Sequence, residues 1–281
     1  MMRRYVLSFG ILCICAVSAS AEDNSAYTLL NPTPKELMRG MATDRPDKTE
    51  SPYTVDAGHY QVELSSLDYE YDHDNPDDPD HLTYAYSVLP INLKVGLLNN
   101  ADLQLVINPY NSQYTRGLED STISGFGEMQ TRLKVNIWGN DSGSSAMAIM
   151  PFIKFPTNAE ELENDDVEGG VTVPIGFKLP MDLNMGFMTE FDFNRNAAED
   201  GYHTEFINSI TLSHSIIGEL SGYVEFFSNV SNEDAASWVG TVDMGLTYLI
   251  KENVQLDLGL NIGVTQSAPD LNPFCGLSMR Y

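Results

Sequence analysis

The charged side chains that alternate with apolar ones are the residues of this chain that could do chemistry. His203 and Glu205 lie two positions apart on one side of an expected strand, where they would suit a metal ion or an acid–base pair. Ser213 and His214 are adjacent and would face opposite sides, and Ser209 would lie about 20 Å from His203 along a strand. Neither combination places a nucleophile beside its base. We therefore expect no catalytic residues and no enzyme activity, and we expect His203 and Glu205 to be ordinary lining.

Metal and cofactor sites are also not indicated. The acidic run DHDNPDDPDH (72–81) lacks the Gly and the final Glu of a calcium-binding loop. No glycine-rich phosphate loop occurs, because the glycines fall at alternate strand positions or in turns. We expect neither metal nor cofactor. The sequence pI of about 4.2 and the net charge of −25 exclude a general nucleic-acid binder, which needs a basic face.

Eleven charged residues, Glu205 among them, occupy positions that would all face the polar side of their strands. The basic ones come from the earlier strands and the acidic ones from the later strands: Lys94, Arg132, Lys134, Lys154 and Lys178, then Glu190, Asp192, Glu205, Glu225, Asp243 and Asp257. A sheet rolled into a cylinder would set a basic wall opposite an acidic wall. Such walls would either orient and filter a small polar or charged solute, or pair across the lumen and brace it.

The elements that position these residues follow an export signal. MMRRYVLSFGILCICAVSASA (1–21) has two arginines, an apolar run too short to span a membrane well, and small residues before Glu22, where we expect cleavage. Removal of Arg3 and Arg4 leaves 13 basic and 40 acidic residues, a net charge of −27. Cys275 is then the one remaining thiol.

Period-two alternation dominates the exported part. In VQLDLGLNIGVTQ (254–266) one face is wholly apolar and the other is polar and glycine-rich. The pattern predicts about twelve strands: 59–71, 82–97, 102–114, 129–137, 145–156, 171–179, 183–193, 202–215, 219–229, 238–250, 254–266 and 273–281. The alternation changes parity near Ser65-Ser66 and near Leu89-Pro90, where we expect β-bulges.

Alternation alone allows a soluble sandwich or barrel as well as a transmembrane barrel, which inverts the pattern. Strands of about 9–13 residues match a tilted bilayer crossing and exceed the usual soluble strand. Aromatic residues near strand ends fit the interfacial girdles of such barrels: Tyr84, Tyr86, Trp138, Phe155 and Trp238. We predict an all-β fold, a transmembrane antiparallel β-barrel of about 12 strands.

Loop lengths give the strongest support for a membrane barrel. Short connections near 98–101, 180–182, 216–219 and 250–253, and a slightly longer one at 139–144, alternate with longer acidic ones at 72–81, 115–122, 157–168, 194–201, 231–237 and 265–270. Short periplasmic turns and long outer loops are typical of outer-membrane barrels. An even number of strands would leave both termini on the short-turn side. We expect a protein of the Gram-negative outer membrane, embedded in its lipid.

Several stretches resemble an outer-membrane transporter family labelled for the meta-pathway of phenol degradation. TDRPDKTESPYTVDAGHYQVE (43–63) matches the opening motif of that family, and ISGFGEMQTRLKVNIWGND, DGYHTEFINSITLSH and DLNPFCGLSMRY are similar more weakly. The resemblance implies a β-barrel channel or transporter, with aromatic or hydrophobic compounds as its solutes, but it does not fix the solute. The motif residues carried over are Thr43, Asp44, Arg45, Pro46, Asp47, Thr49 and Glu50.

We expect three parts: a signal peptide (1–21), an extended N-terminal segment (22–57) and the barrel (58–281). The segment has no strand pattern, and it would either fold into the lumen as a plug or remain a periplasmic tail. The terminal strand ending at Tyr281 resembles those that the barrel-insertion machinery recognises. The expected function is passage of small solutes. A structural or adhesive barrel with a closed lumen, and a lipid-modifying enzyme of the outer membrane, are the alternatives.

Overall fold

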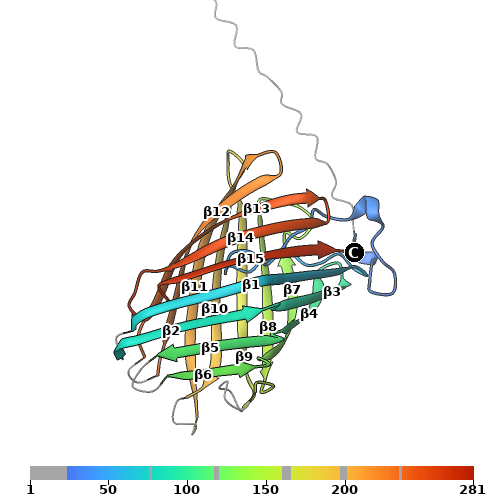
Figure 1. Cartoon of the computed structure of the whole chain (residues 1–281). Helices are drawn as coiled ribbons and strands as arrows, with labels where there is room; N and C mark the ends of the chain where they lie inside the picture. Colours follow the sequence, from blue (N-terminus) through green and yellow to red (C-terminus); the bar gives the residue numbers. More distant parts are fainter. Residues whose placement is uncertain (1–23, 76–77, 117–119, 160–165, 197–200, 234–235) are drawn as a thin grey trace, which may run out of the picture.

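The computed structural model describes residues 24–281 apart from 76–77, 117–119, 160–165, 197–200 and 234–235. The predicted signal peptide lies outside the described residues. Fifteen strand segments form one antiparallel sheet, and the last segment, β15, also pairs with the first, β1. The sheet therefore closes into a barrel (Figure 1). Among the described residues, no helix combines the length and the apolarity needed to cross a membrane.

The bounds of the strand segments are β1 (Tyr60–Asn75), β2 (Asp78–Val88), β3 (Ile91–Leu98), β4 (Ala101–Ile107), β5 (Tyr110–Arg116), β6 (Ser121–Gly125), β7 (Met129–Trp138), β8 (Ser145–Phe155), β9 (Glu168–Lys178), β10 (Leu183–Arg195), β11 (Tyr202–Ile217), β12 (Leu220–Ser231), β13 (Val239–Lys251), β14 (Val254–Gly263) and β15 (Leu271–Arg280). Three successive pairs, β2–β3, β4–β5 and β6–β7, each continue one strand across a bend. The barrel therefore has the predicted 12 strands.

The bends lie next to one another across the sheet. Leu89 has a φ of 56°, and Pro90 has no N–H to donate to a ladder, so the chain cannot continue as one straight strand there. The break expected as a bulge is thus a full interruption, after which β3 pairs with β4 while β2 pairs with β5. The bulge expected at Ser65-Ser66 is confirmed by the register shift between Ser65 and Leu67.

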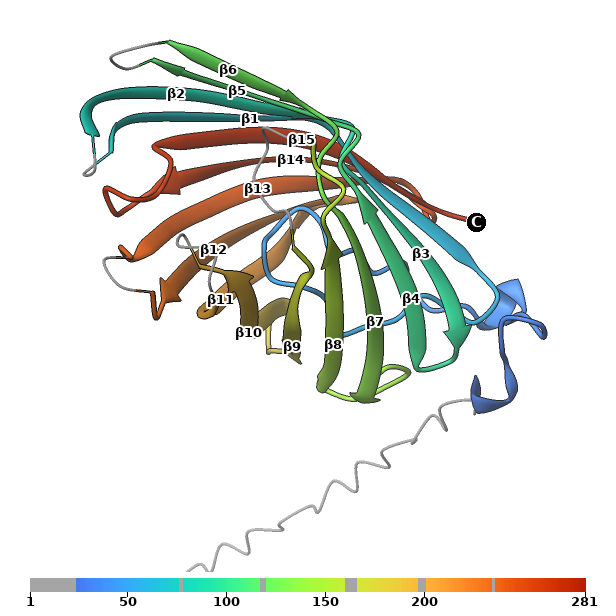
Figure 2. The same ribbon diagram turned by 90° about the horizontal axis from the view of Figure 1, so that it is seen from below.

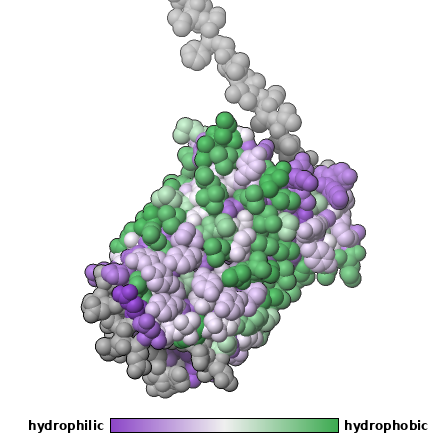
Figure 3. Space-filling model, viewed as in Figure 1, coloured by the Kyte–Doolittle hydropathy of each residue, from purple (hydrophilic) through white to green (hydrophobic). Residues whose placement is uncertain are grey.

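The distribution of side chains is inverted relative to a soluble protein. Inward positions hold buried polar groups such as Gln61, Gln104 and Asp243, whereas outward positions hold exposed apolar ones such as Leu258 and Ile210. Figure 3 shows large apolar areas on this outer surface. An exposed apolar surface of this extent is unfavourable in water but favourable in contact with lipid tails, so the inversion supports the transmembrane barrel.

The two ends of the barrel differ as predicted. Short turns follow Leu98, Ile217 and Lys251. Both termini of the barrel lie at this end, where the Tyr281 amide donates to the Tyr60 carbonyl at 2.8 Å. The predicted loops at 72–81 and 115–122 are longer than the observed ones. The strands β1, β2, β5 and β6 extend into these ranges. A sheet that rises beyond the membrane is wetted on both faces, so its strands lose the apolar alternation that marks the others.

The N-terminal part approaches the barrel from the short-turn end. Two short 3-10 turns, η1 (Asn24–Ala26) and η2 (Lys35–Leu37), lie outside the barrel. Thr28 forms a β-bridge with Leu98, and the Thr33 amide donates to the Ala57 carbonyl at 2.9 Å. The chain then enters the barrel and returns, and Figure 2 shows this loop in blue inside the ring of strands.

Candidate functional site

Residues 40–55, here called the inserted segment, form a loop whose ends are tied together. Arg39 precedes it and Asp56 follows it, and Arg39 Nε lies 3.0 Å from Asp56 Oδ1. The Arg39 guanidinium also donates to the Thr54 carbonyl at 3.2 Å. Compact loops with close ends and internal contacts are Ω-loops, and this one has its neck at the short-turn end of the barrel.

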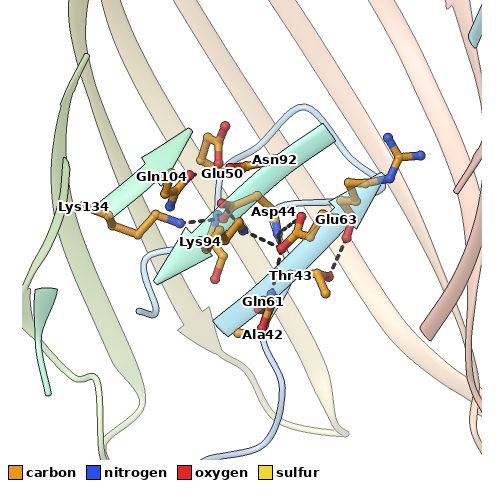
Figure 4. Close-up of polar contacts among 12 residues, drawn as sticks. Ala42, Thr43, Asp44, Glu50, Gln61, Glu63, Asn92, Lys94, Gln104 and Lys134 are labelled. Carbon is orange, nitrogen blue, oxygen red and sulfur yellow. Dashed lines mark hydrogen bonds and ion pairs between the residues drawn. The ribbon is translucent and has the colours of Figure 1, made fainter. Parts of the chain in front are cut away.

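Asp44 anchors the inserted segment to the basic wall. Its carboxylate accepts from Lys134 Nζ at 2.6 Å and also pairs with Lys94 Nζ, which in turn pairs with Glu63. The Asp44 amide donates to the Glu63 carboxylate at 3.1 Å, and Gln61 reaches the Ala42 carbonyl at 2.7 Å. Figure 4 shows these side chains converging from β1, β3 and β7 onto Asp44. All are nearly fully buried, so each charge is neutralised at close range.

The carboxyl groups of the segment respond differently to this environment. Burial alone would raise the pKa of Asp44, but the ammonium groups of Lys134 and Lys94 hold it well below its usual value. Burial and the neighbouring Asp44 charge raise the pKa of Glu50 to about 7, although Arg132 pairs with it at 2.5 Å. Burial and the charge of Glu225 likewise raise the pKa of Asp47.

The opposite wall is matched by the basic residues of the segment. Arg45 Nη2 lies 2.7 Å from Asp257 Oδ1, and the guanidinium carbon is 5.5 Å from the Phe274 ring centroid. Lys48 Nζ donates to the Thr241 hydroxyl at 2.9 Å and lies 3.4 Å from Asp243 Oδ2. Asp44 and Glu50 thus face the basic wall, and Arg45 and Lys48 face the acidic wall; Asp47 lies near Glu225 on the acidic side, where its raised pKa favours the uncharged form.

Backbone groups of the segment are satisfied by wall side chains as well. The amides of Lys48 and Thr49 both donate to the Glu225 carboxylate at 2.8 Å. Farther along, the Val55 amide donates to Asp102 Oδ2 at 2.9 Å, and Asn136 donates to the Pro52 carbonyl at 2.8 Å. A segment that forms no β-ladder inside a barrel needs such partners, because buried backbone N–H and C=O groups without a hydrogen bond cost folding free energy.

Inward-facing glycines of the barrel wall leave space for the inserted segment. A Cβ on Gly96 would lie 2.1 Å from the Asp56 carbonyl oxygen, and one on Gly276 would lie 2.5 Å from Arg45 Nη2. At Gly186 and Gly176 it would meet Thr49 and Pro52 at 3.0 and 3.2 Å. These positions therefore accept the inserted segment where a side chain would exclude it.

The structure places the eleven predicted wall charges as follows. Lys94, Arg132 and Lys134 meet the segment on one side, and Glu225, Asp243 and Asp257 meet it on the other. Lys154 pairs directly with Asp192 at 3.2 Å, and Glu190 accepts from Thr172. His203 Nε2 lies 3.2 Å from Glu205 Oε1. Lys178 borders the short-turn end of the lumen.

Neither alternative for these charges describes the structure fully. Most of these charges neither pair with one another nor remain free. They contact residues of the inserted segment instead. Sequence reasoning missed Arg39, Asp56, Gln61, Glu63 and Asp102, and it missed the role of the glycines. Gln61, Glu63 and Asp102 occupy inward parity positions, which was a usable signal. Nothing in the local pattern of Arg39 or Asp56 indicated that they meet.

Among the motif residues, Thr43 and Pro46 shape the segment rather than neutralise a charge. The Thr43 hydroxyl donates to the Arg45 carbonyl at 2.6 Å and accepts from Gln255 Nε2 at 3.2 Å. The Arg45-Pro46 peptide bond is cis. Thr49 contacts both Glu225 and, at 2.6 Å, the Ser209 hydroxyl. Every residue of the predicted motif thus lies within the loop or at its contacts with the wall.

A cavity of about 520 Å³ remains between the segment and β9–β11 at the short-turn end. Its lining mixes apolar and polar groups, among them Met41, Pro52, Asn184 and Thr211. Within the described ranges, no three His, Cys, Asp or Glu side chains are grouped so that they could hold a metal ion.

Solved structures with the same fold are outer-membrane barrels. The COG4313 outer membrane channel from Pseudomonas putida F1 superimposes with a TM-score of 0.57 at 11% identity, over 85% of this chain and 100% of that one. The β domain of the Bordetella autotransporter BrkA gives 0.51 at 10% identity (79% and 98%), and the NanC porin 0.50 at 10% identity (78% and 98%). At these identities the likeness shows the fold alone.

Sequence comparison identifies the family. No protein with a curated functional description matches the sequence. A family model does match, and it covers nearly the whole barrel together with most of the inserted segment. The chain therefore belongs, over residues 43–281, to the outer-membrane barrel family described as "Putative MetA-pathway of phenol degradation".

Proposed function

We propose that the protein is an outer-membrane channel for small solutes whose lumen is controlled by the inserted segment. The short-turn end is then periplasmic, as in other outer-membrane barrels, and the long loops face outward. Membership of the family and a fold shared with outer-membrane channels support a channel. A lumen of twelve strands is wider than one filled by side chains alone, and here the segment occupies much of it.

The matching of charge between the segment and both walls carries this proposal. Asp44 and Glu50 neutralise the basic wall, while Arg45 and Lys48 neutralise the acidic wall. A tail with no role in the lumen would not need acidic side chains placed against the basic wall and basic side chains placed against the acidic wall. Withdrawal of the segment would expose two charged, hydrated walls and turn a filled barrel into a conducting one.

The solute class that we propose is a small, largely uncharged aromatic compound. The family description names phenol degradation, and the cavity beside the segment joins apolar surface from Met41 and Pro52 to hydrogen-bonding groups from Asn184 and Thr211. A few polar groups in an apolar lining are typical of sites that hold such ligands.

Single-channel conductance tests the function. Residues 22–281 and a variant lacking residues 24–50 would be refolded and recorded in a planar bilayer, with folding checked by heat-modifiable mobility on a gel. We expect small, intermittent steps from the full chain and larger, lasting steps from the deletion. Equal conductance of the two forms would contradict control by the segment. Silence from both folded forms would contradict a channel and favour a closed structural barrel, and a lipid-hydrolysis assay would test the enzyme alternative.

We also propose that the signal is cleaved before Glu22 and that the last strand guides insertion. The C-terminal residue Tyr281 pairs with Tyr60 and so closes the barrel. Removal of Tyr281 should slow assembly by the insertion machinery in reconstituted membranes while leaving detergent refolding largely intact. Equal loss in both settings would mean that Tyr281 matters only for the stability of the closed barrel.

A further inference from the structure

Six tyrosines share the outward face of β1, β2 and β5, and we call them the tyrosine face: Tyr69, Tyr71, Tyr84, Tyr86, Tyr110 and Tyr114. The strand registers fix their direction. Tyr71 lies opposite Leu271, which is exposed on the outer surface, and opposite Tyr84, which in turn lies opposite Tyr114. Residues directly opposite in an antiparallel pair point to the same face. Figure 3 shows a pale area over these strands beside green apolar surface.

The rings of the tyrosine face form two neighbouring groups of contacts. Tyr71 and Tyr84 have ring centroids 5.6 Å apart, and Tyr84 and Tyr114 lie 6.2 Å apart and are stacked. Tyr86 and Tyr110 are 6.1 Å apart at the next row. Ser112, on the same face, is buried beneath these rings. The tyrosine face therefore presents flat aromatic surface together with hydroxyl groups.

The height of the tyrosine face places it at the outer edge of the lipid tails. Tyr71 lies 11 residues along the continuous strand β1 from Tyr60 at the short-turn end. With about 3.3 Å per residue and a tilt of about 40°, that is roughly 28 Å, against an apolar band about 25 Å tall. Tyr84 lies opposite Tyr71, and Tyr114 lies opposite Tyr84, so both are at a similar height. The outward surface there lies where the lipid tails give way to the saccharide layer of the outer leaflet.

The tyrosine face is also confined to one sector of the barrel. Exposed aromatic residues continue around the barrel as an interfacial girdle, for example Phe155, Phe193 and Trp238, whereas the ring-to-ring pairs of tyrosines lie on β1, β2 and β5; β10 and β11 carry a phenylalanine pair, Phe191 and Phe206, at 5.5 Å. Arg116 is exposed at the end of β5, two residues from Tyr114 and on the same face, and the Tyr114 hydroxyl donates to Asp120 at 2.9 Å. Stacking rings, hydroxyl donors and an adjacent guanidinium together match a phosphorylated sugar.

We propose that the tyrosine face binds the saccharide of the lipopolysaccharide that forms the outer leaflet around the barrel. The tyrosine rings pack against sugar rings, their hydroxyls exchange hydrogen bonds with sugar hydroxyls, and Arg116 pairs with a phosphate of the inner core. Bound glycolipid would brace the part of the sheet that rises above the membrane, where β6 pairs with β5 alone among the described strands.

Thermal stability in defined vesicles tests this surface. Residues 22–281 would be reconstituted into phospholipid vesicles alone, with lipid A, or with rough lipopolysaccharide, which adds a short core saccharide. The midpoint for loss of the fast-migrating folded form would be read on gels. We expect rough lipopolysaccharide to raise the midpoint by several degrees more than lipid A does, because a ligand that binds the folded state stabilises it.

Variants decide which surface is responsible. Y71A/Y84A/Y114A should lose the additional rise, while F191A/F206A, the matched aromatic control, should keep it. Should the alanine variant fail to fold, Y71F/Y84F/Y114F keeps the rings without the hydroxyls and should show a smaller rise than the unmodified protein. An unchanged rise in the tyrosine variants would overturn the proposal, as would an equal rise with lipid A. The remaining outcome is a thermal midpoint that rises with protein concentration in vesicles that lack lipopolysaccharide, and that does so only when the tyrosines are present. That result would overturn the proposal and assign the tyrosine face to contact with a second copy of the chain.

Discussion

Arg39 and Asp56, which flank the inserted segment, are bound to each other at 3.0 Å inside the mouth of the barrel. Asp56 is almost fully buried and also pairs with Arg280 of the last strand at 3.1 Å. Entry and exit of the segment are therefore fixed at one point of the wall. A loop held in this way can leave the lumen as one unit toward the short-turn end, without unthreading.

The neck is the first place to test. D56N leaves Arg39 and Arg280 without their buried carboxylate, and we expect a loss of about 3 kcal/mol in unfolding free energy, since breaking a buried ion pair strands its partner. Denaturant unfolding of the refolded barrel measures this. D141N, which removes the more exposed partner of Arg39, should cost less than about 1 kcal/mol. Equal losses would show that the neck is not a stabilising contact.

Asp44 should decide whether the segment stays in the lumen. D44N leaves Lys94 and Lys134 facing each other without a carboxylate from the segment, so the segment should undock. We expect conductance to rise several-fold, because withdrawal of the segment frees both charged walls of the lumen. E36Q, which changes an exposed residue outside the barrel, is the control. Unchanged conductance in folded D44N would show that this anchor does not hold the segment.

Gly96 should be required for docking but not for the barrel. A Cβ there would lie 2.1 Å from the Asp56 oxygen and 2.7 Å from the Val55 oxygen, and backbone atoms cannot move aside cheaply. G96A should therefore fold with normal heat-modifiable mobility but conduct like the deletion variant. In G201A the added Cβ meets only Asn196 Nδ2 at 3.5 Å, so it should behave like the unmodified protein. Normal gating of G96A would show that docking of the segment tolerates a side chain at this position.

Acid should tighten the segment. The pKa of Glu50 is raised to about 7 in the docked state, against an ordinary value of 4.5, so the docked state holds more protons between these values. Docking therefore strengthens as pH falls through 7 and is weakest above it. We expect fewer open events at pH 5.5 than at pH 8 in single-channel records. E50Q mimics the protonated side chain and should reduce this dependence to the part that Asp47 contributes, whereas E36Q should retain it in full. A full dependence in E50Q would assign it to other groups.

The sequence by itself determined the wall of this protein. Alternation in stretches such as 254–266 set which side chains share a face and how many strands there are, and the lengths of the strands and of their connections indicated a membrane barrel with a short-turn end. Such information is local, because a strand has period two and every second residue shares an environment. The parity change at Leu89-Pro90 even marked where the wall bends, although not that the strand breaks there.

The contents of the lumen were decided only by the tertiary structure. Residues 40–55 have no periodicity, so their conformation depends on partners such as Asp102, Glu225 and Asp257, which lie far away in the sequence. The meeting of Arg39 with Asp56 likewise requires the closed wall around the loop. The tyrosines could be seen one by one in the sequence, but the face they form exists only because register aligns three strands. Pairing across strands is a long-range property, and no local pattern encodes it.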